Sequence, residues 1–148
     1  MASESVDLGK IGETYLIYEL LKYGSDKIQI YVPDENNYPY DLIICINNKL
    51  YKTQVKSTKS CHHGKYMTFK TYISIFYGNK KILYSSKDVD MFLFYCLENN
   101  YCGLMLFDEC IYKTVTLRIK SFRNSKNIKY ASDFELHKRL DNLLKGEI

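Results

Sequence analysis

The order of periodic segments predicts an α/β or α+β domain built on one mixed sheet that helices cover. The chain opens on a stretch with helical spacing of apolar residues, continues through several short strand-like runs, and closes on a second helical stretch. With 148 residues it is long enough to bury one hydrophobic core and too short for two comfortable domains. We therefore expect a single domain over residues 1–148.

Two helices are expected near the ends of the chain. Residues 7–24 carry Ile11, Leu16 and Leu20 near helical spacing, and residues 131–146 are predicted as the closing helix. Each helix has recognisable end signals, which are Asp7 and Gly24 for the first, and Ser132 or Asp133 and Gly146 for the second.

The runs between the helices are predicted as strands because apolar, β-branched and aromatic residues dominate them and polar turns separate them. They span residues 27–33, 40–46, 49–56, 66–76, 88–97, 101–110 and 112–119. The run 66–76 fits either a strand or part of a loop-strand connection. Asn47-Asn48 fits a two-residue hairpin turn between the second and third runs.

The composition is that of an ordinary globular domain, with 46% hydrophobic and 26% charged residues. No stretch approaches the roughly 18 to 20 uninterrupted apolar residues that span a bilayer, and no basic start followed by an apolar run opens the chain. The cysteines are odd in number and form no CxxC pair, which argues against a disulfide framework or structural zinc. We therefore expect a soluble protein, with no membrane partner, in an intracellular, cytoplasmic compartment.

Positive charge is concentrated in two parts of the chain. From Leu42 through Lys87 there are nine lysines and no acid, and from Lys113 through Lys129 six basic residues and no acid. Such blocks create a positive field that attracts a polyanion. A solvated, lysine-rich surface from a biased genome is the alternative explanation, and charge alone does not decide between the two.

The hairpin predicted at residues 40–56 brings unusual polar residues together. A two-residue turn at Asn47-Asn48 sets Asp41 opposite Gln54, and alternation along the strand puts Lys56 on the same face. An acid, an amide and an amine therefore converge. The alternative is a pair of surface strands with Lys56 salt-bridged to Asp41 and Gln54 bonded to water.

Glu13 is a candidate fourth member of this cluster. It precedes Leu16 and Leu20 by three and seven residues, which places it on the helix stripe that should pack against the sheet. Gly9 and Gly12 would let this end of the helix approach the sheet closely. Alternatively, Glu13 is a solvated acid in the first turn, favoured by the helix dipole.

These residue types suit phosphodiester hydrolysis. That reaction needs a divalent cation to hold a phosphate oxygen and activate water, and a positive charge to offset the transition state. Carboxylate, amide and backbone carbonyl oxygens are ligands that Mg²⁺ accepts. Asp41, the Val55 carbonyl, and Gln54 or Glu13 can supply them, and Lys56 can position the water or neutralise the phosphate.

The sequences of these segments resemble those of the PD-(D/E)xK nuclease superfamily. The helix "GKIGETYLIYELLKYG" followed by "YPYDLIICINNKLYKTQVKST" is most similar to its small group I intron-encoded homing endonuclease branch, with Holliday-junction resolvases as relatives. The later "SSKDVDMFLFYCLE" and "ASDFELHKRLDNLL" resemble that branch in order and spacing, so the similarity covers roughly residues 8–145. The resemblance implies an α/β restriction-endonuclease-like core, a mixed central β-sheet flanked by helices.

The resemblance also implies roles. Asp41 is the central metal ligand, Gln54 occupies the usual second acidic position, Lys56 is the catalytic lysine, and Glu13 is the auxiliary acid, with the Val55 carbonyl as a further metal ligand. Mg²⁺ is the implied cofactor, with Mn²⁺ as a substitute. Two departures from the family pattern stand out, because Tyr40 separates Pro39 from Asp41 and because Gln54 replaces an acid, which removes a negative charge from the metal site.

We expect the remaining polar loops to place DNA. Residues 57–66, "STKSCHHGKY", offer hydroxyls, histidines and lysines for phosphate contacts beside the site. The expected DNA-binding residues are Lys52, Ser57, Lys59, His62, His63, Lys65, Lys120 and Arg123. Cys61 with the two histidines can alternatively bind a transition metal, although adjacent histidines lack the spacing of a closed zinc site. Asp88 and Asp90 fit a structural turn, with a site-organising role as the alternative.

The function expected from these observations is Mg²⁺-dependent, site-specific endonuclease activity on double-stranded DNA, in the cytoplasm or wherever the target DNA resides. One active site per small subunit implies a homodimer or homotetramer when both strands are cut. Two alternatives stay open, which are a structure-selective Holliday-junction resolvase and a noncatalytic DNA-binding protein on a nuclease fold.

Overall fold

The computed structural model describes residues 4–35, 37–74, 81–110, 113–119 and 127–148. A five-stranded sheet forms the centre, in the order β1-β2-β3-β7-β8. Its strands are β1 (Ile28–Tyr31), β2 (Leu42–Ile46), β3 (Lys49–Thr58), β7 (Met91–Cys96) and β8 (Tyr101–Leu106). β3 pairs with β7 in parallel and the other pairs are antiparallel, so the sheet is mixed, as predicted.

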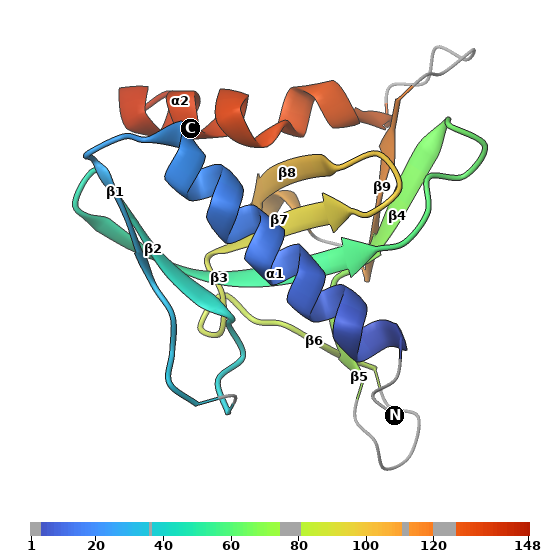
Figure 1. Cartoon of the computed structure of the whole chain (residues 1–148), viewed down its shortest axis with the longest axis horizontal. Coiled ribbons are helices and arrows are strands. Elements are labelled where there is room, and N and C mark those ends of the chain that lie inside the picture. The colour runs from blue at the N-terminus through green and yellow to red at the C-terminus, as the bar shows by residue number, and fades with distance from the viewer. Residues whose placement is uncertain (1–3, 36, 75–80, 111–112, 120–126) are drawn as a thin grey trace.

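Two helices and two smaller sheets surround this sheet (Figure 1). The helices are α1 (Glu4–Tyr23) and α2 (Leu136–Lys145). One small sheet has the order β10-β9-β4, with β4 (Tyr66–Lys70), β9 (Thr114–Arg118) and β10 (Lys129–Tyr130), and the other pairs β5 (Tyr72–Ser74) with β6 (Lys81–Leu83). Short 3₁₀ turns, η1 (Phe107–Glu109) and η2 (Ala131–Phe134), complete the described elements.

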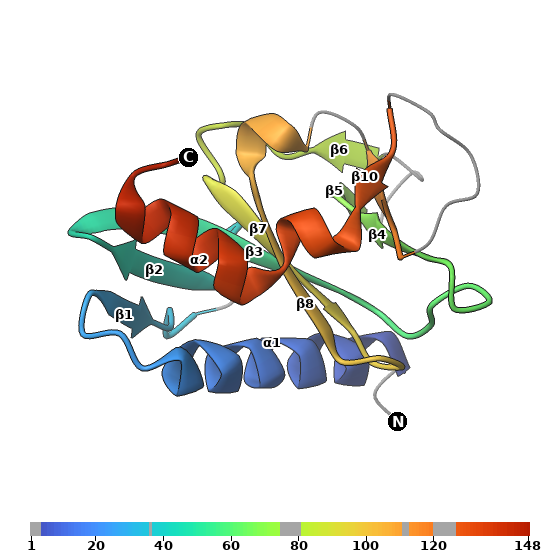
Figure 2. The ribbon, with the colours of Figure 1, turned by 90° about the horizontal axis from the view of Figure 1, so that it is seen from above.

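Both helices pack on the same face of the five-stranded sheet. Leu16 of α1 and Leu140 of α2 are fully buried in one cluster with Leu93 of β7. The opposite face carries a second cluster, in which Phe94 of β7 packs with Phe69 of β4. Figure 2 shows α1 on one side of the sheet and β4, β5 and β6 on the other. The fold class is confirmed, and both α-helices of the described residues lie on one face of the sheet.

The β2–β3 hairpin has the predicted turn. Asn47 and Asn48 have φ values of 55° and 66°, the left-handed conformation that a two-residue type I′ turn requires at both positions. The resulting register pairs Leu42 with Thr53. The Asp41 N–H donates to the Thr53 carbonyl at 2.9 Å, which continues the ladder one residue beyond β2 and sets Asp41 opposite Gln54.

The starts of the two helices differ from the prediction. α1 already includes Glu4, so Asp7 lies inside the helix and does not cap it. In α2 the cap is Glu135, whose carboxylate accepts from the N–H groups of His137 and Lys138 at 3.2 and 3.0 Å, because the predicted caps belong to η2. Both predicted helix ends are confirmed, since glycine in the left-handed conformation follows each helix at positions 24 and 146.

The strand predicted over residues 66–76 is two strands. β4 and β5 are separated by Thr71, whose N–H donates to the Lys113 carbonyl at 2.8 Å. β4 then pairs with β9 and β5 with β6, so the two halves belong to different sheets. Residues 75 and 76 lie outside the described part of the chain.

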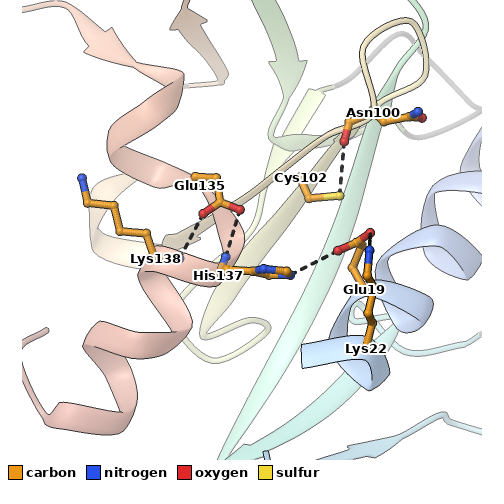
Figure 3. A network of polar contacts seen from close by, with 7 residues as sticks. All are labelled: Glu19, Lys22, Asn100, Cys102, Glu135, His137 and Lys138. Atoms are coloured by element: carbon orange, nitrogen blue, oxygen red, sulfur yellow. Dashed lines mark hydrogen bonds and ion pairs between the residues drawn. The ribbon is translucent and has the colours of Figure 1, made fainter. Parts of the chain in front are cut away.

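Polar contacts join the first and last helices (Figure 3). His137 Nε2 of α2 lies 3.1 Å from a Glu19 carboxylate oxygen of α1, and the Lys22 ammonium lies 4.0 Å from the other oxygen. Nearby, the Tyr23 hydroxyl donates to the Asp141 carboxylate. The His137–Glu19 and Tyr23–Asp141 contacts connect α1 to α2, while Lys22 pairs with Glu19 within α1.

The cysteines and the length of the helices bear on crosslinking and membrane crossing. All five cysteines are buried and free, so no disulfide crosslinks the fold. Neither helix, within the residues that the structure covers, is long and apolar enough to cross a membrane.

α1 touches β3 most closely at Gly12. A Cβ added there would overlap the Ser57 hydroxyl and lie 3.1 Å from Ser57 Cβ and 3.3 Å from the Tyr95 ring. The expectation of a close approach at Gly12 is therefore met. The same expectation for Gly9 is wrong, because nothing lies within 4 Å of a Cβ built at that position.

We predict that Gly12→Ala lowers the free energy of unfolding by about 1–3 kcal/mol, since the new methyl group forces α1 away from β3. Chemical denaturation monitored by circular dichroism measures this. Gly9→Ala is the matched control and should be neutral or stabilising by up to about 1 kcal/mol, because alanine has the better helix propensity and meets open space. Equal losses in the two variants would contradict the close contact.

Candidate active site

The four residues predicted for catalysis come from three elements. Asp41 immediately precedes β2, Gln54 and Lys56 lie on β3, and Glu13 lies one residue after the close contact of α1 with the sheet. All four side chains are partly buried.

Asp41 is the centre of the hydrogen bonding. Its Oδ2 accepts from the Gln54 side-chain amide at 2.7 Å and from the Val55 backbone N–H at 2.9 Å. The Gln54 amide also lies 3.3 Å from the Val55 carbonyl oxygen. Of the four expected metal ligands, Gln54 therefore contacts both Asp41 and the Val55 carbonyl.

Glu13 shares the electrostatic environment of Asp41. Burial raises the pKa of Glu13 above its usual value of 4.5, the negative charge of Asp41 raises it further, and Lys10 lowers it. Burial also raises the pKa of Asp41, opposed by the Val55 N–H and by the charge of Lys56. Two partly buried carboxylates, one of which makes ionisation of the other more costly, form a site that a cation would stabilise.

Lys56 points to the same side as Asp41 and is held by neutral groups. Its ammonium donates to the Tyr72 carbonyl at 3.4 Å and lies 4.9 Å from the centre of the Tyr84 ring. Burial lowers the pKa of Lys56 below 10.5, and the charge of Asp41 partly offsets this. The lysine is thus coupled to the acid, although its direct contacts are a carbonyl and an aromatic face.

A groove of about 560 Å³ opens beside Lys56. Its walls come from the N-terminal part of α1, from β3 and β4, and from the β5–β6 region. The lining residues are Leu8, Gly9, Val55, Lys56, Ser57, Thr58, Lys59, Thr68, Lys70, Tyr72 and Tyr84. Three lysines and three threonine or serine residues in this lining give it cationic and hydrogen-bonding character.

The loop after β3 contains half of the residues predicted to bind DNA. Lys59, His62, His63 and Lys65 are all exposed. The backbone of His63 is left-handed, with φ of 51°, and the His62 ring stacks on Tyr66 with ring centres 4.9 Å apart. These side chains therefore project from a defined turn next to the groove.

Other predicted DNA-binding residues have different surroundings. The Ser57 hydroxyl is buried beneath α1 without a hydrogen-bond partner, so its DNA contact stays a prediction. The Lys52 ammonium donates to the Lys87 carbonyl. Lys120 and Arg123 lie outside the described residues.

Asp88 and Asp90 have structural roles. Asp88 accepts from the N–H and hydroxyl of Ser85 at 2.9 Å each, and these bonds lower its pKa. Asp90 accepts from the Lys52 backbone N–H at 2.8 Å and so ties the start of β7 to β3. The structural alternative for this pair is therefore the one that the geometry supports.

The described residues contain no group of three or more histidine, cysteine, aspartate and glutamate side chains arranged for a metal ion. Cys61 is buried and its N–H donates to Glu98, so the alternative metal site with His62 and His63 is not assembled. At the candidate active site, Glu13 and Asp41 are two acids, and Gln54 occupies the place where a third would complete such a group.

Two residues beside Lys56 were missed from the sequence. Tyr72 and Tyr84 reach it from the β5–β6 region, far from β3 along the chain. Nothing local marks them among the 15 tyrosines of the chain. A periodic pattern identifies strands, but the packing of the small β5–β6 sheet beside β3 of the central sheet decides which tyrosine meets the lysine.

The chain is similar to known proteins in family and in fold. Residues 4–137 match the family model described as PD-(D/E)XK endonuclease. Among solved structures, the chain is similar to a bacterial homing endonuclease, I-Ssp6803I, with a TM-score of 0.71 and 19% sequence identity over 98% of this chain and 96% of that one. At this identity the likeness shows the fold, which is restriction-endonuclease-like. No curated protein matches the chain.

The family match extends from the first described turn of α1 into the start of α2, and so includes Glu13, the β2–β3 hairpin and the whole five-stranded sheet. The chain therefore belongs to the PD-(D/E)XK endonuclease family.

Proposed function

We propose that the protein is a divalent-metal-dependent endonuclease that hydrolyses phosphodiester bonds in duplex DNA at a specific site. One observation carries the proposal: Asp41, Gln54 and the Val55 backbone are in mutual contact while Glu13 and Lys56 are electrostatically coupled to Asp41. Family membership and the cationic groove beside Lys56 support it.

The donor set fits a hard divalent cation. Asp41, Glu13 and the Val55 carbonyl supply oxygen ligands, and a half-turn of the Gln54 amide would direct its oxygen to the same place. The raised pKa values of both acids mean that ionisation is costly without a counter-charge. When bound, Mg²⁺, or Mn²⁺ in its place, would polarise the scissile phosphate and lower the pKa of a water molecule.

The chain's own residues then orient the reaction. The Lys56 ammonium, beside the groove, offsets the negative charge that builds on the phosphate as water attacks phosphorus and the bond to the leaving oxygen breaks. Asp41 keeps Lys56 close to the acids by attraction, and Glu13 compensates for the charge that Gln54 lacks. Attack by water leaves one phosphate-terminated and one hydroxyl-terminated strand end.

Placement on DNA follows from the surface around the groove. Lys59, His62, His63 and Lys65 are proposed to contact phosphates, with Lys52, Ser57, Lys120 and Arg123 as further contacts. Because one chain offers one such site, cutting both strands calls for a homodimer or homotetramer. Light scattering that shows a monomer on DNA would contradict this.

Homing for an intron is the role that the family resemblance suggests, inside the cell wherever the target DNA resides.

A noncatalytic DNA-binding role is the second candidate, and one observation favours it. Gln54 leaves two acids where a metal site would gain from a third. Such a protein would bind DNA with a steep salt dependence and without metal-dependent cleavage. The junction-resolvase alternative shares the proposed site and differs in substrate, so it predicts preference for a four-way branched DNA over a linear duplex.

Lys56→Ala is predicted to lower Mg²⁺-dependent nicking of supercoiled DNA by about 10²–10⁴-fold, because the charge facing the phosphate is lost. Gel analysis of nicked and linear products measures this. Lys49→Ala is the matched control, since Lys49 lies exposed at the other end of β3 and should leave nicking unchanged. Nicking that needs no metal, or that survives Lys56→Ala, would contradict the proposal, and DNA binding with no cleavage in any metal would favour the noncatalytic role.

Gln54→Glu is predicted to tighten Mg²⁺ binding and to lower the stability of the metal-free protein. The new carboxylate adds charge to the metal site but faces the Asp41 carboxylate and the Val55 carbonyl when no cation is present. Calorimetric titration with Mg²⁺ and thermal unfolding with and without metal measure the two effects. Gln29→Glu is the control, because Gln29 is exposed on the edge strand β1, and it should change neither. Unchanged Mg²⁺ affinity in Gln54→Glu would remove Gln54 from the site.

Glu13→Gln is predicted to raise the melting temperature of the metal-free protein at pH 7 and to impair cleavage. Because burial and Asp41 raise the pKa of Glu13 in the folded state, its contribution to stability is fully present below about pH 4.5 and is lost as the pH rises through the folded pKa. Thermal unfolding from pH 4 to 8 should therefore show a smaller decline in the variant. Glu35→Gln is the exposed control, and an identical pH profile in wild type and Glu13→Gln would contradict the coupling.

A further inference from the structure

Two groups at one end of the β5–β6 ladder contact Lys56. Tyr72 begins β5 and pairs with Leu83, and Tyr84 follows directly after β6. Tyr72 and Tyr84 therefore lie next to each other at one end of the ladder. One offers its backbone carbonyl, 3.4 Å from the Lys56 ammonium, and the other its ring, with the centre 4.9 Å away.

The Tyr84 ring is held firmly from behind. Tyr84 is 9% exposed, and its ring meets the Phe92 ring edge-on at 78° with the ring centres 5.5 Å apart. Phe92 is 1% exposed and pairs in register with Gln54 of β3. Packing against β7 therefore fixes the ring relative to the strand that carries Lys56.

An aromatic face suits a lysine that must act on phosphate. A partly buried ammonium needs a stabilising neighbour, and the negative face of a tyrosine ring attracts it without forming a salt bridge. A carboxylate in that position would hold the ammonium more strongly and compete with an incoming phosphate. The ring also limits the rotamers of a long side chain that would otherwise sample many.

We propose that Tyr84 is a positioning residue for Lys56, holding the ammonium at the edge of the groove by contact with its ring face. This inference rests on the proposed catalytic role of Lys56. It assigns a function to the β5–β6 ladder, which contributes no residue to the set predicted from the sequence. Tyr84 itself also lines the groove, at the boundary between Lys56 and the second hydrophobic cluster.

The contact is tested by NMR on the metal-free protein labelled with ¹³C-lysine. Methylene protons above an aromatic ring resonate upfield, so the terminal methylene of Lys56 should be shifted upfield of its random-coil position. Its peak is identified as the one that disappears in Lys56→Arg. The shift should persist in Tyr84→Phe, which keeps the ring, and vanish in Tyr84→Leu, which does not.

Steady-state cleavage kinetics test the role. Tyr84→Leu should lower kcat about tenfold while KM for DNA changes less than about twofold, and Tyr84→Phe should keep kcat close to wild type. Tyr101→Leu is the control for lost aromatic packing, because Tyr101 also packs against the second cluster and its hydroxyl bonds to the Ala131 carbonyl, away from Lys56. Its kcat should match wild type once the rates are corrected for the folded fraction.

Three results would overturn the inference. The first is an unshifted Lys56 methylene in wild type, and the second is equal kcat in folded Tyr84→Leu and wild type. The third is an equal loss of kcat in Tyr84→Phe and Tyr84→Leu, which would assign the effect to the hydroxyl. Failure of the proposed function is distinct. In that case the wild-type protein itself does not cleave DNA, and the catalytic part of the inference is wrong as well. The NMR spectrum still decides whether the Tyr84 ring holds Lys56.

Discussion

One carboxylate oxygen of Asp41 joins the start of β2 to the middle of β3, and the candidate site depends on that junction. It accepts the Gln54 amide and the Val55 N–H together. Both bonds require the register that Asn47 and Asn48 impose, because a slip of one residue would turn every β3 side chain to the opposite face. With the register in place, Lys56 follows two residues after Gln54 on the same face, and α1 needs only its glycine contact to bring Glu13 alongside.

The same junction brings three charged groups into surroundings where ionisation is unfavourable. Burial raises the pKa of both acids and lowers that of the lysine, so all three charges are less favourable here than in water. Proteins commonly accept such local instability where charged groups must be ready for a ligand. The rest of the domain is conventional by comparison, with one well-packed cluster on each face of the sheet, in which strand β7 is buried along its whole length.

Local signals in the sequence were sufficient for the elements and for the register of the hairpin. The two asparagines predicted the turn, alternation predicted the shared face of Gln54 and Lys56, and the glycines at 24 and 146 predicted the helix ends. Long-range packing was not predictable in this way. The break at Thr71, the small sheet on the second face and the approach of Tyr84 to Lys56 all join segments whose spacing carries no periodic signal. The cap at Glu135 was missed because shorter polar residues nearby are usually preferred.

The tie between α1 and α2 bears on how the chain acquires its shape during synthesis. Tyr23 and Asp141 are 118 positions apart, and leucines of both helices share one buried cluster. Contacts of such long sequence separation form late, since loop closure must precede them. While a ribosome is still translating β7 and β8, the first helix lacks the leucines of α2 with which it shares that cluster. The nascent chain thus gains its full set of packed layers only after the last helix has emerged from the exit tunnel.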